Sequence, residues 1–297
     1  KLKSCLKYFI FLITLFLVFS KAIAEPTFVQ SKSIDIGFYL GLTFNNDGTK
    51  MYTVESDKSS DAVVEYILTT AYDISTATVN NTKVVHRSGG VNKFVPSQVV
   101  FNNDGTKMFI SNHAGENTID YWSLSTAFDI STATFNEAFE LDGQEQRANS
   151  VAFNNDGTRM IVAGAGNMSQ HRIHEYSLAT PFEFSSGVTH LNTEDLSSTL
   201  DYIDGVTFKD DGTKMYTIIS ETEDDDNISQ IFQFKLTTPY DVSTLSLEGT
   251  FDVSSVSADS RELVFSNDGS KMFILDDSND KVHEFNLSCN WSVIDGA

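Results

Sequence analysis

Short apolar runs and tight polar turns alternate along the chain from residue 26 to residue 293. Runs such as Leu42-Thr43-Phe44 and Val99-Val100-Phe101 precede an Asp-Gly pair, and a second apolar run, such as Met51-Tyr52-Thr53-Val54, follows it. Because Asp-Gly between two apolar runs is the strongest short signal for a β-hairpin, each pair predicts two antiparallel strands joined by a tight turn. No sustained helical period occurs between residues 26 and 293.

This hairpin unit is repeated five times. The copies read FNNDGTKMY, FNNDGTKMF, FNNDGTRMI, FKDDGTKMY and FSNDGSKMF, and they begin at Phe44, Phe101, Phe153, Phe208 and Phe265, with steps of 57, 52, 55 and 57 residues. Each copy is followed by a third strand-like block, such as IHEYSL from Ile173. In four copies a turn such as TAYDIS comes next, and stretches such as Thr82–His86 and Thr134–Leu141 predict a fourth strand.

Four antiparallel strands repeated at this period predict an all-β fold, a five-bladed β-propeller. The fifth copy ends after its third strand, whereas residues 26–37 resemble a fourth strand, with FVQSKSIDIG matching FNEAFELDGQ. We therefore expect the N-terminal strand to complete the last blade and to remove an exposed sheet edge. A sixth blade beyond Ala297 is the alternative.

The repeated motif, Phe-x-x-Asp-Gly-Thr-Lys-Met-aromatic followed by Ile-x-Glu-Tyr-x-Leu, resembles the bacterial propeller repeats of the YVTN and Tol-translocation type. The resemblance covers nearly all of residues 26–293. It implies a propeller whose variable loops share one face around a central channel. It also implies a range of roles from binding scaffolds to lactonase-like enzymes, among which the fold alone does not choose.

The first 24 residues have the pattern of a cleavable signal peptide. Lys1, Lys3 and Lys7 precede an apolar run from Tyr8 to Phe19, and Ala22-Ile23-Ala24 is a small-x-small cleavage site. That run is shorter than the ~20 residues of a membrane span, so an uncleaved anchor is the weaker alternative. The sequence predicts a secreted or periplasmic protein with a single domain over residues 25–297 and no membrane contact after cleavage.

Charge and cysteine content narrow the range of partners. Residues 25–297 contain 16 basic and 41 acidic residues, a net charge of −25. Such a surface repels nucleic acid and anionic membranes, since both are bound through Lys and Arg. Cys289 is the only cysteine after residue 24, which predicts a monomer held together by its core rather than by a disulfide.

The repeated Asp of each Asp-Gly pair has a structural explanation in turn geometry, so candidate sites lie in the segments that differ between repeats. These are the loops between the second and third strands and the crossovers between blades. They predict one composite site on the variable-loop face for a carbohydrate or a protein partner. The candidate ligand-binding residues are Phe94, His113, Glu145, Arg147, His171, Arg172, Tyr202, Asp204 and Arg261.

Two further hypotheses come from the acidic residues. Carboxylate oxygens suit Ca²⁺, and the acidic runs 221–227 and 276–280 predict a calcium site formed by Glu221, Asp224, Asp225, Asp226, Asp276 and Asp277. Asp204 with Glu262 or Asp259 could form the two-carboxylate arrangement of a glycosidase- or lactonase-like hydrolase. No Ser nucleophile elbow, zinc helix motif or phosphate loop is present, so the sequence favours an extracytoplasmic binding scaffold over an enzyme and requires no cofactor.

Overall fold

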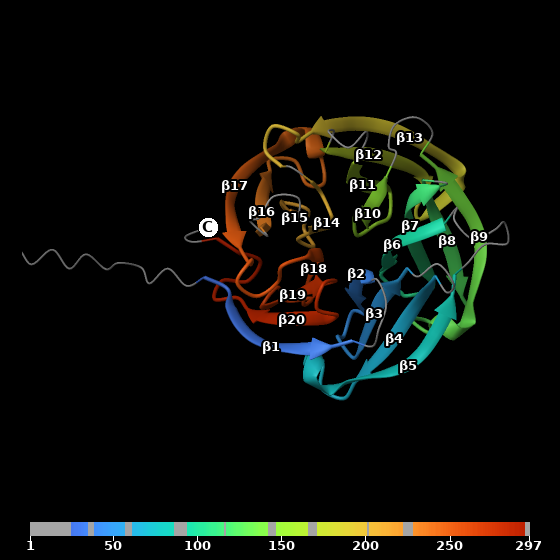
Figure 1. The fold of residues 1–297 in the computed structure, drawn as a ribbon. Helices are drawn as coiled ribbons and strands as arrows, with labels where there is room; N and C mark the ends of the chain where they lie inside the picture. The colour runs from blue at the N-terminus through green and yellow to red at the C-terminus, as the bar shows by residue number, and fades with distance from the viewer. Residues whose placement is uncertain are drawn as a thin grey trace, which may run out of the picture.

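The structure, a computed structural model, describes residues 25–34, 39–56, 61–85, 94–115, 117–141, 147–165, 171–200, 202–221 and 228–294. In these ranges twenty strands form five antiparallel sheets of four strands each, arranged in a ring (Figure 1). The predicted five-bladed propeller is confirmed. The predicted signal peptide lies outside the described residues, and within the described ranges no helix has the length and hydrophobicity of a membrane span.

Each blade is a four-stranded meander that runs outward from the channel. Blades 1 and 2 consist of β2 (Tyr39–Phe44), β3 (Lys50–Glu55), β4 (Ala62–Leu68), β5 (Ala77–Val84), and of β6 (Phe94–Phe101), β7 (Lys107–Gly115), β8 (Thr118–Leu124), β9 (Ala133–Glu140). Blades 3 and 4 consist of β10 (Ala148–Phe153), β11 (Arg159–Ala165), β12 (His171–Thr180), β13 (Glu183–Asp195), and of β14 (Gly205–Phe208), β15 (Lys214–Glu221), β16 (Ile228–Leu236), β17 (Leu245–Asp252). Blade 5 consists of β18 (Ser260–Phe265), β19 (Lys271–Asp276), β20 (Lys281–Asn286) and β1 (Thr27–Ser33).

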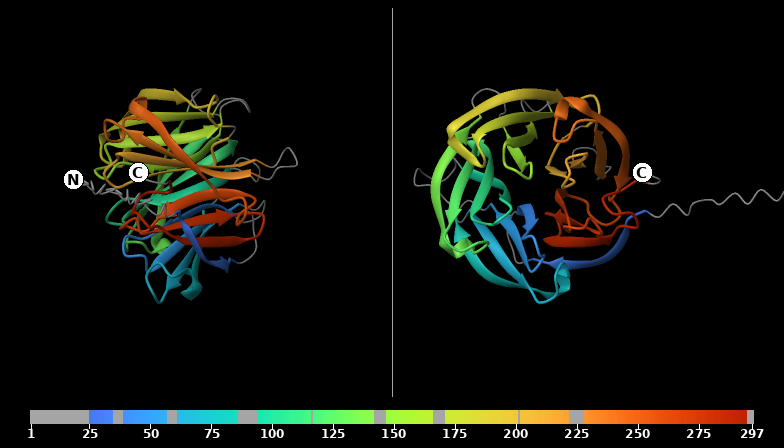
Figure 2. Two further views of the ribbon diagram at one scale, coloured as in Figure 1. Left: turned by 90° about the vertical axis from the view of Figure 1, so that its left-hand side faces the viewer. Right: turned by 180° about the vertical axis from the view of Figure 1, so that it is seen from behind.

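The N-terminal strand closes the ring as expected. β1 pairs antiparallel with β20 from Thr27↔Asn286 to Ser33↔Lys281. Figure 2 shows the same closure from the side and from behind, with β1 along the outer side of the last blade. Blades 5 and 1 also share a buried apolar cluster that includes Leu42 and Phe273, so the junction is packed like the others.

The repeated Asp-Gly turns are locked by an aromatic residue of the same blade. The turn glycines, such as Gly48, have φ of 68–70°, and the aromatic residue that lies on each of them, such as Tyr72, has φ of 56–59°. The N–H of Tyr72 donates to the Gly48 carbonyl at 2.9 Å. A Cβ on any of these glycines would lie within 2.3 Å of an aromatic ring atom, so only glycine fits there. The aromatic partners are Tyr72, Phe128, Phe182, Tyr240 and Trp291.

The Asp of each turn has the structural role that the sequence predicts. Asp47 Oδ1 accepts hydrogen bonds from the Thr49 hydroxyl and from the Thr49 N–H, the latter at 2.9 Å, and the other four turns repeat the arrangement. These bonds, the hydroxyl first, hold the pKa of Asp47 below its ordinary value. The turn aspartates therefore fix the hairpin and are not ligands.

Neighbouring blades are joined through the same aromatic residues. Lys50 Nζ and Tyr52 Oη both donate to the Phe128 carbonyl, at 2.8 and 2.7 Å. Lys271 Nζ donates to the Tyr72 carbonyl at 2.9 Å across the closing junction. In four of the five motifs the Lys or the aromatic residue thus links its hairpin to the turn of the next blade, and blade 3, which has Arg159 and Ile161 at these positions, is the exception.

The fourth strands differ from prediction in one place. β9 and β1 lie where the sequence predicts them, but β5 begins at Ala77, not at Thr82. The reason is that the short 3₁₀ helix η1 (Ile74–Thr76), capped by the Asp73 carboxylate, turns the chain directly into pairing with β4 at Leu68↔Ala77.

The strand order defines two faces of the propeller. The Asp-Gly turns and the 3₁₀ turns lie on one face, here called the turn face. The loops between second and third strands and the crossovers between blades lie on the other, the loop face. Figure 1 shows β2, β6, β10, β14 and β18 nearest the axis, so these strands position any channel site.

Candidate site at the loop-face mouth of the channel

One side chain from each innermost strand converges at the loop-face end of the channel. Each of these residues stands four positions before the repeat phenylalanine. In four blades a β-bulge leaves this residue outside the ladder, for example between Tyr39 and Gly41 in β2 and between Ser260 and Glu262 in β18. A bulge re-aims a side chain, so two successive residues of each strand face the axis. We call the outer set the mouth ring: Leu40, Ser97, Asn149, Asp204 and Arg261.

The mouth ring surrounds a small cavity of about 50 Å³. His113 of β7 and Tyr202 of the crossover before β14 complete its lining. At roughly 10–15 Å³ for each water, the cavity has room for a few water molecules or for one functional group of a larger ligand. The five blades thus supply one composite site rather than five equal ones.

Arg261 is the centre of charge in this site. Its guanidinium contacts Asp204 at 3.2 Å, Asp259 at 3.0 Å and Asp277 at 3.8 Å. The Arg261 side chain keeps 28 % of its surface exposed, whereas that of Asp204 keeps 6 %. A guanidinium presents a planar set of donors that remains charged, and it is the part of the cluster that a ligand can reach.

Asp204 is buried beneath Arg261. Its Oδ2 accepts hydrogen bonds from the Ser220 N–H at 3.0 Å and from the Ser220 hydroxyl at 3.2 Å, and the same hydroxyl lies 3.0 Å from Asp259. Burial raises the pKa of Asp204 to about 7, although Arg261 and Ser220 act in the opposite direction. Both oxygens of Asp204 are therefore engaged within the protein.

His113 is neutral in this setting. Burial, followed by the positive charges of Arg147 and Arg261, lowers the pKa of His113 to about 4. A neutral imidazole has one donor and one acceptor nitrogen and no charge to repel Arg261. His113 therefore adds hydrogen-bonding groups without charge beside Arg261 and its three carboxylates.

A polar layer below the mouth ring closes the channel. We call it the channel floor: Gln98, Ser150 and Glu262, one position further along their strands than the mouth ring, with Gly41 and Gly205 completing the layer. Gln98 Oε1 accepts from the Ser150 hydroxyl at 2.8 Å, and the Val206 N–H donates to Ser150 Oγ at 2.9 Å.

Glycines make room for the floor. A Cβ on Gly205 would lie 2.4 Å from Glu262 Oε1, and one on Gly41 would lie 2.6 Å from the Gln98 Cα. Only glycine fits at these two positions, because the Glu262 side chain and the Gln98 backbone lie so close to them. The side chains of Gln98, Ser150 and Glu262 fill the space that side chains at residues 41 and 205 would otherwise occupy. The floor connects four blades through side chains across the axis.

Glu262 is a buried acid with no cation bonded to it among the described residues. Its side chain is fully buried, its Oε1 accepts from the Leu263 N–H at 3.0 Å, and its Oε2 has no hydrogen-bond partner in the described part of the chain. Burial raises the pKa of Glu262 well above its ordinary value, against hydrogen bonds from Leu263 and Gln98. Burial therefore favours the protonated form of Glu262.

The structure brings most of the predicted ligand-binding residues together. His113, Tyr202, Asp204 and Arg261 line the cavity, Arg147 is close enough to act on His113, and the His171 ring lies 6.0 Å from that of Tyr202. Arg172 is elsewhere: it lies toward the outer strand of blade 3, opposite Asp195, with its Nε 3.7 Å from that carboxylate. Glu145 and the Phe94 side chain lie outside what the structure describes.

The predicted calcium ligands are only partly described. Residues 222–227 and the Glu221 side chain lie outside the described part. Asp277 belongs to the Arg261 cluster, and Asp276 accepts from His283 Nε2 at 3.1 Å and from Asn279 and Ser278. Within the described residues no group of three or more His, Cys, Asp or Glu side chains could hold a metal ion, and the calcium site stays a prediction.

Sequence reasoning missed Ser97, Asn149 and the floor residues Gln98 and Ser150. The signal was present in the repeat itself, because the fourth position before the repeat phenylalanine differs in every blade and the third is glycine in two blades and polar in the other three. What could not be read from the sequence is the bulge that turns both positions toward the axis.

Comparison with known proteins gives no family assignment. No family model and no curated protein matches the sequence. Among solved structures, a functionally unknown protein from Desulfotomaculum acetoxidans is similar with a TM-score of 0.48 and 15 % identity, over 84 % of this chain and 69 % of that one.

Two other solved structures show comparable similarity. The periplasmic gluconolactonase of Pseudomonas aeruginosa gives a TM-score of 0.48 and 14 % identity, over 86 % of this chain and 68 % of that one. The β-propeller domain of Myceliophteria thermophila Cps50 (Swd1) gives 0.47 and 9 %, over 87 % and 100 %. These relationships concern the propeller fold only.

Proposed function

We propose that this chain is an extracytoplasmic binding protein that holds one group of a carbohydrate at the loop-face mouth of its channel. The observation that carries the proposal is the convergence of five different side chains, one per blade and four of them polar, on a single small cavity that Tyr202 and His113 complete. The floor closes the channel below, so a ligand enters from the loop face and remains there.

Carbohydrate is favoured by the chemistry of the lining. The charge of Arg261 is offset by three carboxylates, Asp204, Asp259 and Asp277, and His113 is neutral, so the site suits hydroxyl groups better than an anionic ligand. Tyr202, beside the His171 ring, offers a flat surface of the kind that small-molecule sites use together with a few polar groups. A cavity of about 50 Å³ would accept one substituent, with the rest of the sugar on the surrounding loops.

A carboxylate-dependent hydrolase is the second candidate. The raised pKa values of Asp204 and Glu262 are what a general acid requires. Hydrolysis by two carboxylates also needs both groups at the substrate. Here Glu262 is fully buried and both oxygens of Asp204 are bonded to Arg261 and Ser220, which favours binding.

The test is thermal unfolding of the protein with a panel of oligosaccharides, gluconolactone and calcium. A ligand at a hundred times its Kd should stabilise the fold by about 2.7 kcal/mol, a shift of several degrees in Tm. Tyr202→Ala should remove a sugar-induced shift, whereas Arg172→Ala, outside the site, should keep it. Turnover of the lactone would favour the hydrolase, and absence of any shift would favour a protein partner.

A further inference from the structure

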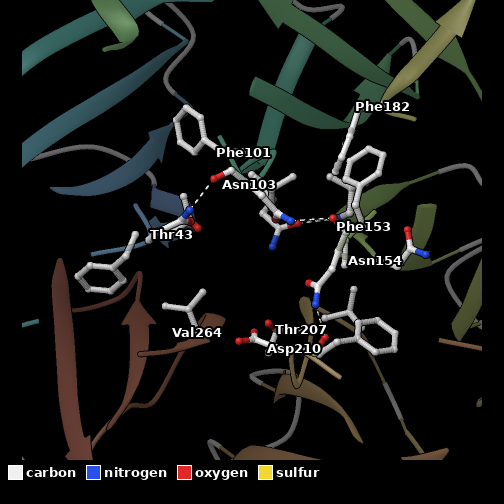
Figure 3. Close-up of a pocket in the computed structure, with 18 of the residues that line it drawn as sticks. Thr43, Phe101, Asn103, Phe153, Asn154, Phe182, Thr207, Asp210 and Val264 are labelled. Carbon is white, nitrogen blue, oxygen red and sulfur yellow. Dashed lines mark hydrogen bonds between the residues drawn. The ribbon is translucent and has the colours of Figure 1, made fainter. Parts of the chain in front are cut away.

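The channel has a second opening, on the turn face, that is larger than the loop-face mouth. Its cavity measures about 220 Å³ and reaches down to Gln98 of the channel floor (Figure 3). Val100, Ala152 and Val264 contribute apolar walls, and the repeat phenylalanines of blades 1 to 4 stand around them. The floor network of Gln98 and Ser150 separates this cavity from the loop-face site, so the two are independent.

A ring of asparagine side chains surrounds this opening. Asn46 Nδ2 donates to the Asn103 carbonyl at 2.5 Å, Asn103 Nδ2 to the Asn155 carbonyl at 2.7 Å, and Asn155 Nδ2 to the Asp210 carbonyl at 2.6 Å. Asn267 Nδ2 donates to the Asn46 carbonyl at 2.8 Å. Each bond joins one blade to its neighbour, and the dashed lines of Figure 3 follow three of them.

The ring is broken at blade 4, where Asp210 replaces asparagine. A carboxylate has no N–H to donate, so the link from blade 4 to the Asn267 carbonyl cannot form. Asp210 instead places an exposed carboxylate at the rim, and no hydrogen bond joins this carboxylate to another described residue. The charge of Lys209 acts on Asp210, while Lys209 Nζ itself contacts Asp211 at 2.7 Å.

The surroundings specify what this carboxylate can bind. The side-chain N–H groups of the four asparagines donate to backbone carbonyls, which leaves their amide oxygens as acceptors around the opening. An ammonium group has three N–H donors and no acceptor. Its positive charge complements the negative charge of the Asp210 carboxylate. The accessible lining of the cavity is mostly polar, and Val100, Ala152 and Val264 provide a smaller apolar part that a short alkyl chain can contact. The net charge of −21 raises the local concentration of such cations.

We propose that the turn-face cavity binds the ammonium end of a short alkylamine, free or as a lysine side chain, with Asp210 as its counter-ion and the apolar walls around its chain. The cavity is below the usual size of a site for a drug-sized ligand, which limits the occupant to one such chain. Figure 3 shows Asp210 and Thr207 together on the side of the cavity that faces Asn103, where the charged end would lie.

The experiment is titration of the full protein with n-pentylammonium, followed by calorimetry and by amide chemical shifts. Pentan-1-ol serves as the uncharged analogue. The matched variants are Asp210→Asn, which restores the residue found in the other blades, and Glu140→Gln, which removes one charge from an exposed position of β9. Asp210→Asn should weaken pentylammonium binding about tenfold or more, because a hydrogen-bonded charge is lost, while Glu140→Gln should leave it unchanged.

The outcomes separate the alternatives. Pentylammonium binding that is equal in Asp210→Asn or that is matched by pentan-1-ol would overturn the proposal, and so would the absence of binding by both pentylammonium and a lysine-rich peptide. A parallel titration with a lysine-rich peptide identifies the source: binding of the peptide alone assigns the cavity to a protein side chain, and binding of the amine alone assigns it to a free amine. Failure here leaves the loop-face sugar site untouched, because the two cavities share no mouth residue.

Discussion

At the scale of single residues, the turn acids and the channel acids of this chain have pKa values shifted in opposite directions. The turn aspartates, such as Asp47, accept hydrogen bonds from the residue two positions on, and their pKa values are lowered. The channel acids Asp204 and Glu262 are buried, and their pKa values are raised. The first group stabilises the fold when ionised, and the second destabilises it when ionised.

Replacement of Glu262 by glutamine should stabilise the protein at neutral and alkaline pH. Because the folded protein retains the Glu262 proton above the pH at which the unfolded chain releases it, wild-type stability falls as pH rises through that interval. The slope from one such group is roughly 1.4 kcal/mol per pH unit. Glu262→Gln keeps the shape of the protonated acid and removes this slope.

Urea unfolding of wild type and Glu262→Gln at pH 4.5, 7 and 9 measures the effect. The free energies of unfolding of the two proteins should be equal at pH 4.5 and should differ increasingly as pH rises. Glu140→Gln is the surface control, and its free energy of unfolding should change with pH as that of wild type does. A constant difference at all three values would show that Glu262 is not the titrating group.

Asp210→Asn should raise Tm while it removes the proposed amine site. The new Nδ2 would donate to the Asn267 carbonyl and complete the ring. One hydrogen bond stabilises a folded protein by about 1 kcal/mol, which corresponds to a rise in Tm of about 2 °C for a chain of this size. A lowered Tm in a differential scanning measurement would mean that blade 4 does not follow the geometry of its neighbours.

At the scale of elements, each hairpin is held by a glycine and an aromatic residue, both with positive φ. Gly48→Ala would place a methyl group 2.3 Å from the Tyr72 ring in a backbone conformation that alanine disfavours. Strain of about 1–2 kcal/mol and overpacking of about 1–3 kcal/mol should add. Gly187→Ala is the matched control, since its φ of 121° is also positive but its nearest neighbour, Ala179 Cβ, is 3.9 Å away.

The urea midpoints of the two alanine variants separate the cost of backbone strain from the cost of the contact with the Tyr72 ring. Gly187→Ala reports backbone strain alone, and the excess loss in Gly48→Ala reports the ring contact. Equal losses would mean that the Tyr72 ring moves aside at little cost.

The hairpins could be predicted from the sequence alone, because the residues that specify each turn are close together in the chain. Asp-Gly fixes a turn within four residues, and the spacing of the copies reveals the blade. The aromatic locks and the inter-blade bonds to Phe128 and Tyr72 could not be read in this way, because they join residues from about 25 to 199 positions apart. The early start of β5 likewise depends on a three-residue helix that leaves little trace in an apolar pattern.

At the scale of the whole molecule, the ring depends on β1. Deletion of residues 1–33 should leave β20 as an unpaired edge in blade 5, lower Tm by many degrees and promote aggregation. Deletion of residues 1–26 keeps β1 (Thr27–Ser33) and is the control. Size-exclusion chromatography and thermal unfolding of both truncations test this, and equal behaviour would show that packing between blades 5 and 1 closes the ring without β1.

The candidate site was predictable in place but not in composition. Loop variability predicts a site on the loop face, and His113, Tyr202, Asp204 and Arg261 do line one cavity there. Arg172 was included because it is adjacent in sequence to His171, but successive residues of a strand point to opposite sides, and it pairs with Asp195. The turn-face cavity gave no signal as a loop, because it is formed by the most repetitive residues of the chain.

The position of β1 also bears on how copies of this protein are made. Gln30 and Glu284, hydrogen-bonded at 2.8 Å in the closed ring, are 254 residues apart, so the first strand to leave the ribosome waits for the last one to be synthesised. Until then blade 5 is incomplete, whatever the earlier blades have done. A chain interrupted before β20 has no partner for β1 and leaves that strand unpaired. Pairing of β1 with β20 therefore has to follow synthesis of all five blades.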